Sequence, residues 1–342
     1  MASSPALPAR FIALDIRTNA VMIGAVDARQ HVALTPRQVA LGALESWGRL
    51  HLRSADALVI AAPSCVWQLH DQLAPLVASI TIAHPQLSSL LPALRTSAGA
   101  RDAIALARLH AAGLVPALWA PPAEVRDLRA LTAQRRRLLN QRSAARTLLH
   151  ELLRRYHLTP PGSDRLAADQ PDWWETRGLA PDDMLRARAG LCDLNRVPTL
   201  LTEAEADLEQ RASMPPWRAP ATALLHDIPG MRRLDASILL AEIGAVARFP
   251  SADKLAAYAG LAGNTSAAVY NGRHKIRSTM LEIARAAVHE DATWQATFAA
   301  LAQRAGRDRA IVATARKLLV LVWETLTTYV AMDDQLVRQV AA

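Results

Sequence analysis

The sequence is poor in cysteine, lysine and aromatic side chains. Its 342 residues include two cysteines, four tyrosines and three phenylalanines, and its only lysines are Lys254, Lys275 and Lys317. Cys65 and Cys192 lie far apart, and neither has the spacing to a histidine that a metal site requires. This pattern excludes a disulfide framework and a zinc site, and two lone cysteines are typical of a reducing cytoplasm.

Long hydrophobic runs are also absent. Apolar runs such as residues 318–323 are too short to span a bilayer. The first ten residues have no charged start followed by an apolar core, so they do not resemble a signal peptide. We therefore expect a soluble cytoplasmic protein with no membrane partner.

Arginine, alanine and leucine dominate instead. Hydrophobic residues make up 51% of the chain, which is typical of a helix-rich protein, and the net charge is +8 with a pI near 10.2. Arginine matches the geometry of phosphate oxygens, so this balance favours a nucleic-acid partner. A GC-rich genome would also enrich arginine, and composition alone leaves both explanations open.

Residues 10–122 have the pattern of an α/β domain, preceded by a flexible stretch over 1–9. Aliphatic runs predict strands at 11–16, 21–26, 31–34, 57–62 and 79–83, and periodic segments predict helices at 41–53, 66–77 and 102–112. A strand meander followed by βα units favours a ribonuclease-H-like domain over a Rossmann domain. No Gly-rich loop follows the first strand, which argues against nucleotide binding.

Residues 123–215 predict a helical coiled-coil stalk. One long helix covers 124–156, residues 159–183 form a linker or insertion rich in proline and tryptophan, and a second helix follows over 184–212, with a possible break at Pro198. Arg135 and Arg142 interrupt the heptad seam. The block Arg135, Arg136 and Arg137 is a candidate nucleic-acid contact, although a solvated charged face would have the same pattern.

Residues 216–342 predict an all-helical domain that begins with a helix-hairpin-helix over 224–244. The turn at Ile228-Pro229-Gly230 and the helix end at Gly244 define the hairpin. Backbone N–H groups of such a turn can bind a phosphate. Candidate nucleic-acid contacts in this domain are Gly230, Arg232, Arg233, Arg273, Lys275 and Arg277.

Several of these motifs occur together in one family. They are an acid motif at 13–16, an apolar strand at 59–64 with Trp67 after it, a His-Pro step at 84–85, Asp102-Ala103, the hairpin, Arg-Phe-Pro at 248–250, Ala-Ala-Tyr-Ala-Gly-Leu at 256–261 and the segment 307–323. Over nearly its whole length the chain resembles the DEDD-type insertion-sequence transposases numbered one-ten, relatives of the pilin-gene invertase Piv.

The resemblance implies an architecture and a chemistry. It implies a ribonuclease-H-like (RuvC-like) domain in which Asp15 and Asp102 bind Mg²⁺, and a helical domain in which Ser266 is the nucleophile. It also implies DNA and a structured guide RNA as partners, in a homo-oligomer such as a dimer or tetramer. Thr265 and Ser278 are weaker candidates for the nucleophile.

The sequence departs from the family at positions that this chemistry requires. Two metal ions in a ribonuclease-H-like site need several carboxylates. Ala61 stands at the family's glutamate position and Gly99 at its third acid, so we expect a weakened Mg²⁺ site and impaired catalysis. Gly263 replaces a proline, and Ala267 replaces the glycine that follows the family's serine.

The sequence therefore predicts a transposase-type DNA recombinase for insertion-sequence transposition or site-specific recombination, with impaired catalysis. A catalytically inactive, repurposed nucleic-acid-binding protein is the alternative. A structural oligomer built on the stalk is a third possibility.

Overall fold

The computed structural model describes residues 8–61, 66–84, 100–160, 166, 170–262 and 274–340. The chain divides into two compact units, Met1–Ala120 and Pro121–Ala342. The first is a mixed α/β unit, and the second contains helices but no strands among its described residues. The prediction of an α/β part followed by an all-α part is confirmed at this level.

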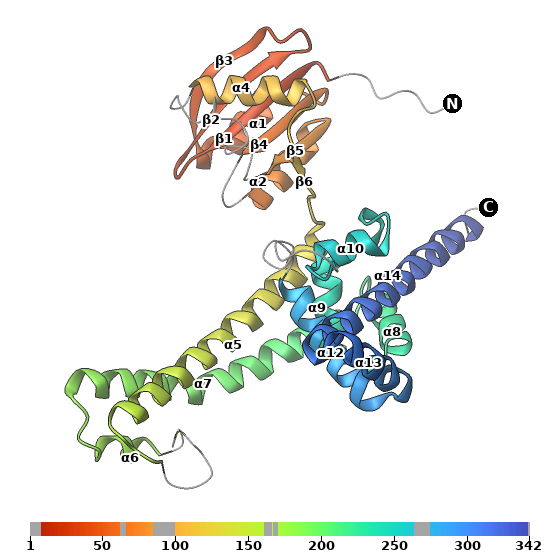
Figure 1. The fold of residues 1–342 in the computed structure, drawn as a ribbon. Helices are drawn as coiled ribbons and strands as arrows, with labels where there is room; N and C mark the ends of the chain where they lie inside the picture. The colour runs from red at the N-terminus through yellow and green to blue at the C-terminus, as the bar shows by residue number, and fades with distance from the viewer. Residues whose placement is uncertain are drawn as a thin grey trace. The chain divides into compact units, whose positions relative to one another are not determined.

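A six-stranded sheet forms the centre of the first unit, in the order β3-β2-β1-β4-β5-β6 (Figure 1). Central β1 pairs antiparallel with β2 and parallel with β4, β4 and β5 are parallel, and the outer pairs β2–β3 and β5–β6 are antiparallel. The strand bounds are β1 Arg10–Ile16, β2 Ala20–Asp27, β3 Val32–Ala40, β4 Asp56–Ala61, β5 Ser79–Ala83 and β6 Ala117–Leu118.

Strand β3 is longer than the predicted 31–34 because Pro36, which has no N–H to donate, lies on an edge strand where it is tolerated. Two predicted helices each include a 3-10 turn: η1 Leu41–Ala43 precedes α1 Leu44–His51, and η2 Ala74–Leu76 follows α2 Val66–Leu73.

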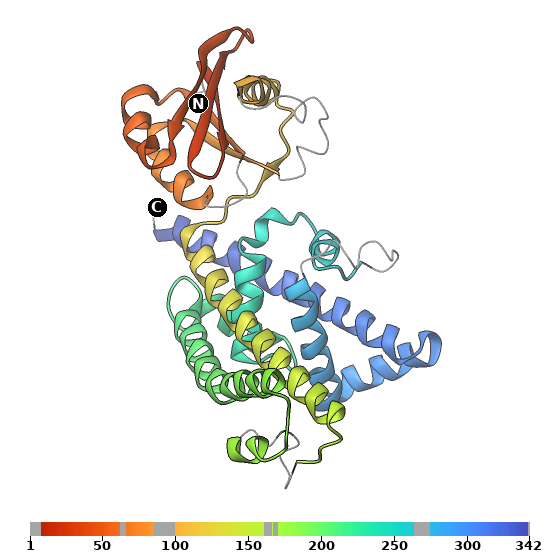
Figure 2. The same cartoon turned by 90° about the vertical axis from the view of Figure 1, so that its left-hand side faces the viewer.

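Successive side chains of each strand point to opposite faces of the sheet, and different helices cover the two faces (Figure 2). Ile12, Leu14 and Ile16 belong to the core beneath α1 and α2. Phe11 and Ala13 belong to the core beneath α4 Ala100–Ala111 on the opposite face. This alternation places Asp15 on the face that α4 covers.

A buried ion pair joins the first residues of β1 and β4. The fully buried Asp56 carboxylate accepts hydrogen bonds from the Arg10 guanidinium at 2.6 and 2.9 Å and from the Arg53 amide at 2.7 Å. These bonds satisfy the charge that burial would otherwise make costly. Asp56 therefore has a structural role, at the end of the sheet opposite Asp15.

The helical unit begins with two long helices, α5 Ala123–Arg155 and α7 Pro181–Ala212, which lie side by side in Figures 1 and 2. Short α6 Pro171–Glu175 lies in the connection between them. Helix α7 continues through Pro198, so the break considered at this proline does not occur. The Pro198 carbonyl, inside the helix, accepts a hydrogen bond from the Thr202 hydroxyl at 3.1 Å.

The described residues of this unit form six further helices: α8 Arg218–Asp227, α9 Arg233–Ile243, α10 Ala252–Tyr258, α12 His274–Glu290, α13 Ala292–Ala305 and α14 Arg307–Val340. Helices α5, α7, α8 and α12 all pack on α9, so the long helices and the C-terminal helices form one compact unit. No helix within the described ranges is both long and apolar enough to cross a bilayer.

The turn between α8 and α9 packs tightly on α12. Gly230 has φ +73°, and a Cβ atom there would lie 2.5 Å from the Ala287 nitrogen and 2.9 Å from the Ile283 carbonyl oxygen. Contacts this short with backbone atoms cannot be relieved by a side-chain movement. Glycine is therefore required here by packing as well as by backbone conformation.

We expect Gly230→Ala to destabilise the helical unit by about 1–3 kcal/mol beyond the cost of backbone strain. Gly178→Ala is the matched control, because Gly178 has φ +68° in the same unit but no atom within 4 Å of the added Cβ. Its expected cost is about 1–2 kcal/mol from backbone strain alone. Urea denaturation of both variants measures the difference, and equal losses would contradict the packing argument.

Candidate active site and nucleic-acid interface

Asp15 and Asp102 lie close together in the first unit. Asp15 is near the carboxyl end of β1, on the face that α4 covers, and Asp102 is in the first turn of α4. Arg17 contacts both: its Nη2 atom is 3.3 Å from Asp15 Oδ2 and 3.9 Å from Asp102 Oδ2. The two acids were singled out from the sequence, whereas Arg17 was not, although it lies only two residues after Asp15.

The position beside Asp15 carries no acid. Ala61 is the direct partner of Asp15 in the parallel register of β1 and β4. Gly99, the other departure from the family's acids, lies outside the described residues. Within the described part of the chain, no group of three or more His, Cys, Asp or Glu side chains could hold a metal ion. Two carboxylates with a guanidinium between them do not fit a site for two divalent cations.

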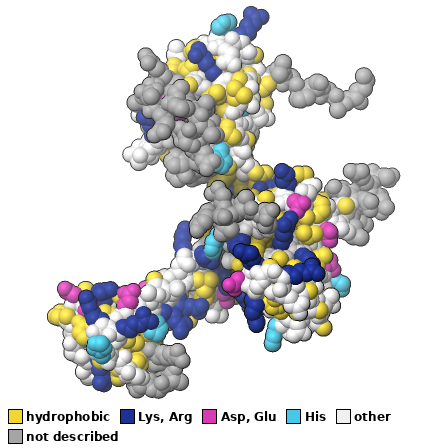
Figure 3. Space-filling model, in the orientation of Figure 1, with side chains coloured by type: hydrophobic (Ala, Val, Ile, Leu, Met, Phe, Trp, Pro, Cys, Tyr) yellow, Lys and Arg dark blue, Asp and Glu magenta, His cyan; other side chains and the backbone are white. Residues whose placement is uncertain are grey.

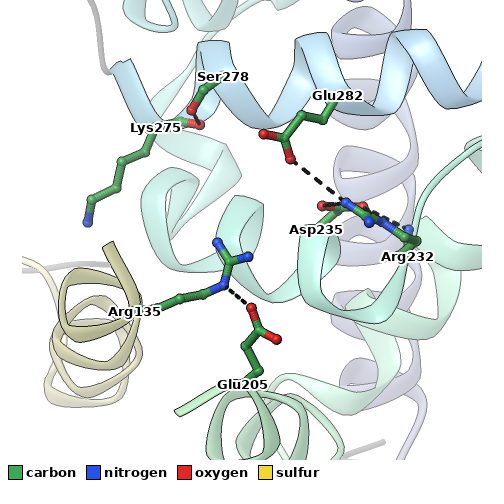
Figure 4. Close-up of polar contacts among 7 residues, drawn as sticks. All are labelled: Arg135, Glu205, Arg232, Asp235, Lys275, Ser278 and Glu282. Atoms are coloured by element: carbon green, nitrogen blue, oxygen red, sulfur yellow. Dashed lines mark hydrogen bonds and ion pairs between the residues drawn. The ribbon is translucent and has the colours of Figure 1, made fainter. Parts of the chain in front are cut away.

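Helix α9 is buried on all sides, with every residue from Asp235 to Ile243 shielded from solvent. The Asp235 carboxylate accepts hydrogen bonds from the Arg232 guanidinium at 2.8 and 3.1 Å and from the Arg232 backbone amide at 3.2 Å. Figure 4 shows Arg232 between Asp235 and Glu282 of α12. The hydrogen bonds to Asp235 raise the pKa of the Arg232 guanidinium. Arg232, a candidate phosphate ligand, is also the N-cap residue of α9.

The opposite end of α9 holds a second buried carboxylate. Glu242 is fully buried, and its carboxylate lies 2.8 Å from the Lys275 ammonium, which also donates to the Thr132 hydroxyl of α5 at 3.3 Å. The Arg129 guanidinium donates to the carbonyls of Ala241 and Glu242 at 2.7 and 3.0 Å. Cations at the last carbonyls of a helix are stabilising, as Arg129 is here. Lys275 ties α12 to α9 and α5 through its contacts with Glu242 and Thr132.

The residues around the predicted nucleophile are described only in part. Ser266, Thr265 and Arg273 lie outside the described residues. Arg277 donates a hydrogen bond to the Gly260 carbonyl, so α12 is tied to the residues just after α10. Ser278 donates to the Lys275 carbonyl at 3.1 Å within α12, as helical serines commonly do.

The arginines of the α5 block have different surroundings. The Arg135 Nε atom donates to Glu205 of α7 at 2.7 Å, as Figure 4 shows. Arg136 is half-buried and Arg137 is exposed, and neither has a hydrogen-bond or ion-pair partner among the described residues. Exposed Arg233 lines a cavity of about 490 Å³ with Arg218 and Glu209. Figure 3 shows further Lys and Arg side chains at intervals over the helical unit.

The sequence of α9 and of the helices around it is similar to a known protein family. Residues 222–299 match the model of the transposase IS116/IS110/IS902 family. Over this segment the chain is similar to that transposase family. The match runs from α8 through α9, α10 and α12 into α13. No curated protein matches the chain. The resemblance to insertion-sequence transposases is confirmed, and DNA is the partner that this family indicates.

We expect Lys275→Met to destabilise the helical unit by about 3 kcal/mol, because it removes a cation that lies 2.8 Å from the fully buried Glu242 carboxylate. Glu242→Gln combined with Lys275→Met should restore part of that loss, since the buried negative charge is then absent as well. Denaturant unfolding of the single and double variants tests this coupling. Unchanged stability with weaker DNA binding in Lys275→Met would show instead that Lys275 serves mainly as a phosphate ligand.

Proposed function

We propose that this chain is the recombinase of an insertion sequence, which binds DNA together with a structured guide RNA and supports transposition or site-specific recombination. The observation that carries the proposal is the transposase match over residues 222–299, the helices built around α9. We infer a homo-oligomer, a dimer or tetramer, as the working form.

The fold supports this assignment. A sheet whose central β1 pairs antiparallel with β2 and parallel with β4, with acids at its carboxyl edge, suits a ribonuclease-H-like (RuvC-like) domain. Helices α5 and α7 suit a coiled-coil stalk, and α8 and α9 with their turn suit a helix-hairpin-helix.

In this proposal, nucleic acid binds to the arginines whose side chains do not hold the fold together. Arg136, Arg137 and Arg233 are the strongest members, because burial of α9 requires no contact from their side chains. Arg232, Arg135 and Lys275 already pair with carboxylates and would contribute less to phosphate binding.

We expect Arg136→Gln with Arg137→Gln to weaken binding to duplex DNA across sequences and to lower the slope of log affinity against log salt by about two. Adding Arg135→Gln should weaken binding only slightly further, because Arg135 pairs with Glu205. Fluorescence anisotropy between 50 and 200 mM salt, about the range over which such contacts are lost, measures both quantities.

Arg186→Gln with Arg188→Gln is the matched control for this experiment. It removes the same charge from α7, but both side chains pair with carboxylates, Asp183 and Glu175. Equal effects of the two double variants would show that net charge alone drives binding. A competing structured RNA in the same assay tests the guide-RNA part of the proposal.

Catalysis in this proposal is impaired. Among the described residues at this edge, Mg²⁺, the family's cofactor, would have only Asp15 and Asp102 as carboxylate ligands, and Ser266 would attack the scissile phosphate. Asp15, Asp102 and Ser266 are therefore retained as the catalytic candidates.

We expect Ser266→Ala to abolish covalent protein–DNA adducts while DNA affinity stays nearly unchanged, because one hydroxyl contributes little to a charge-driven interface. Denaturing gels with labelled DNA and Mg²⁺ detect such adducts, and Ser278→Ala is the matched control. Adducts that persist in Ser266→Ala and disappear in Ser278→Ala would identify Ser278 as the nucleophile.

The second candidate function is a catalytically inactive nucleic-acid-binding protein. The alanine beside Asp15 and the guanidinium between the two acids favour it. Salt-dependent binding without any adduct from the wild-type protein would support this alternative over the active recombinase.

A further inference from the structure

The contact of Arg17 with Asp15 and Asp102 differs from the structural ion pair of the same sheet. In the Arg10–Asp56 pair the Arg10 side chain is 17% exposed, the Asp56 side chain is fully buried, and the separation is 2.6 Å. The Arg17 side chain is 48% exposed, and its separations from the two acids are 3.3 and 3.9 Å. Exposed pairs of this kind contribute little to stability.

The Arg17 guanidinium has N–H groups that take no part in its contacts with Asp15 and Asp102. It carries five N–H groups in a planar fork, and the contacts with Asp15 and Asp102 involve the Nε and Nη2 atoms. The remaining Nη1 donors belong to a half-exposed side chain. A planar fork of this kind matches the oxygens of a phosphate group.

The described residues around Arg17 supply few carboxylate ligands for divalent cations. Asp15 and Asp102 supply two negative charges, and Ala61 supplies none at the adjoining strand position. The guanidinium donates to Asp15 through Nε and Nη2 and lies within ion-pair distance of Asp102, which leaves its Nη1 donors for a further anion. A hydrogen bond from a charged donor to a phosphate oxygen is roughly twice as strong as a neutral one.

We propose that Arg17 links the Asp15–Asp102 pair directly to a phosphate of bound nucleic acid, so that the first unit holds a strand without a divalent cation. This inference rests on the nucleic-acid binding of the proposed function. Arg17 is a phosphate ligand in this arrangement, and the two acids are positioning residues that orient its guanidinium.

The test is the affinity of the full chain for duplex DNA, measured by fluorescence anisotropy in EDTA and in Mg²⁺ at matched ionic strength. We expect the wild-type affinity to be the same in both. Arg17→Gln should weaken binding roughly tenfold, the loss typical of a charge-assisted contact. It should also lower the salt slope by about one.

Arg49→Gln is the matched control, because Arg49 is an exposed arginine of the same unit that pairs with Glu45 at 2.8 Å. It should change neither affinity nor slope measurably. Arg17→Lys keeps the charge and should bind more tightly than Arg17→Gln. Thermal melting of each variant checks that the fold is retained.

Two results would overturn the proposal while leaving nucleic-acid binding intact. One is an Arg17→Gln variant that binds as tightly as Arg49→Gln. The other is a wild-type protein whose binding is lost in EDTA and restored by Mg²⁺. A wild-type protein that binds no nucleic acid at low salt would overturn the proposed function as well.

Discussion

The burial of α9 is the constraint on which the helical unit depends. A helix enclosed on all sides must satisfy each of its polar groups inside the protein, because an unpaired buried charge would cost several kcal/mol. Arg232 satisfies Asp235, Lys275 satisfies Glu242, and Arg129 satisfies the last carbonyls of the helix. These cations come from three places in the chain and join α5, the hairpin turn and α12 around one element.

This constraint divides the cations of a strongly basic chain into two groups. Those that meet α9 are held by its carboxylates and carbonyls, whereas Arg136, Arg137 and Arg233 are not required by its burial. The sheet shows the same division, since the buried Arg10–Asp56 pair joins two strands and the half-exposed Arg17 contacts two acids at the sheet's edge. Net charge alone therefore overestimates the number of arginines that can bind phosphate.

Much of the fold could be predicted because local patterns control it. Alternating aliphatic residues predicted β1 and β2, and Gly244, which has a positive φ, marks a helix end where the sequence predicts one. The extension of β3 through Pro36 and the continuity of α7 through Pro198 could not be predicted, because tertiary packing overrides the local preference against proline there. In the candidate site, Asp15 and Asp102 were found from motifs, but the contact of Arg17 with both was not.

The sequence by itself determined the element types, the basic charge, the family of the segment 222–299 and the absence of an acid at position 61. All of these are properties of residues or of short stretches. Only the tertiary structure decided that Arg17 reaches Asp102 and that Lys275 pairs with Glu242, because these partners are distant in the chain and packing sets their separation. A charged side chain has many possible partners in a sequence, and burial and distance select the one that neutralises it.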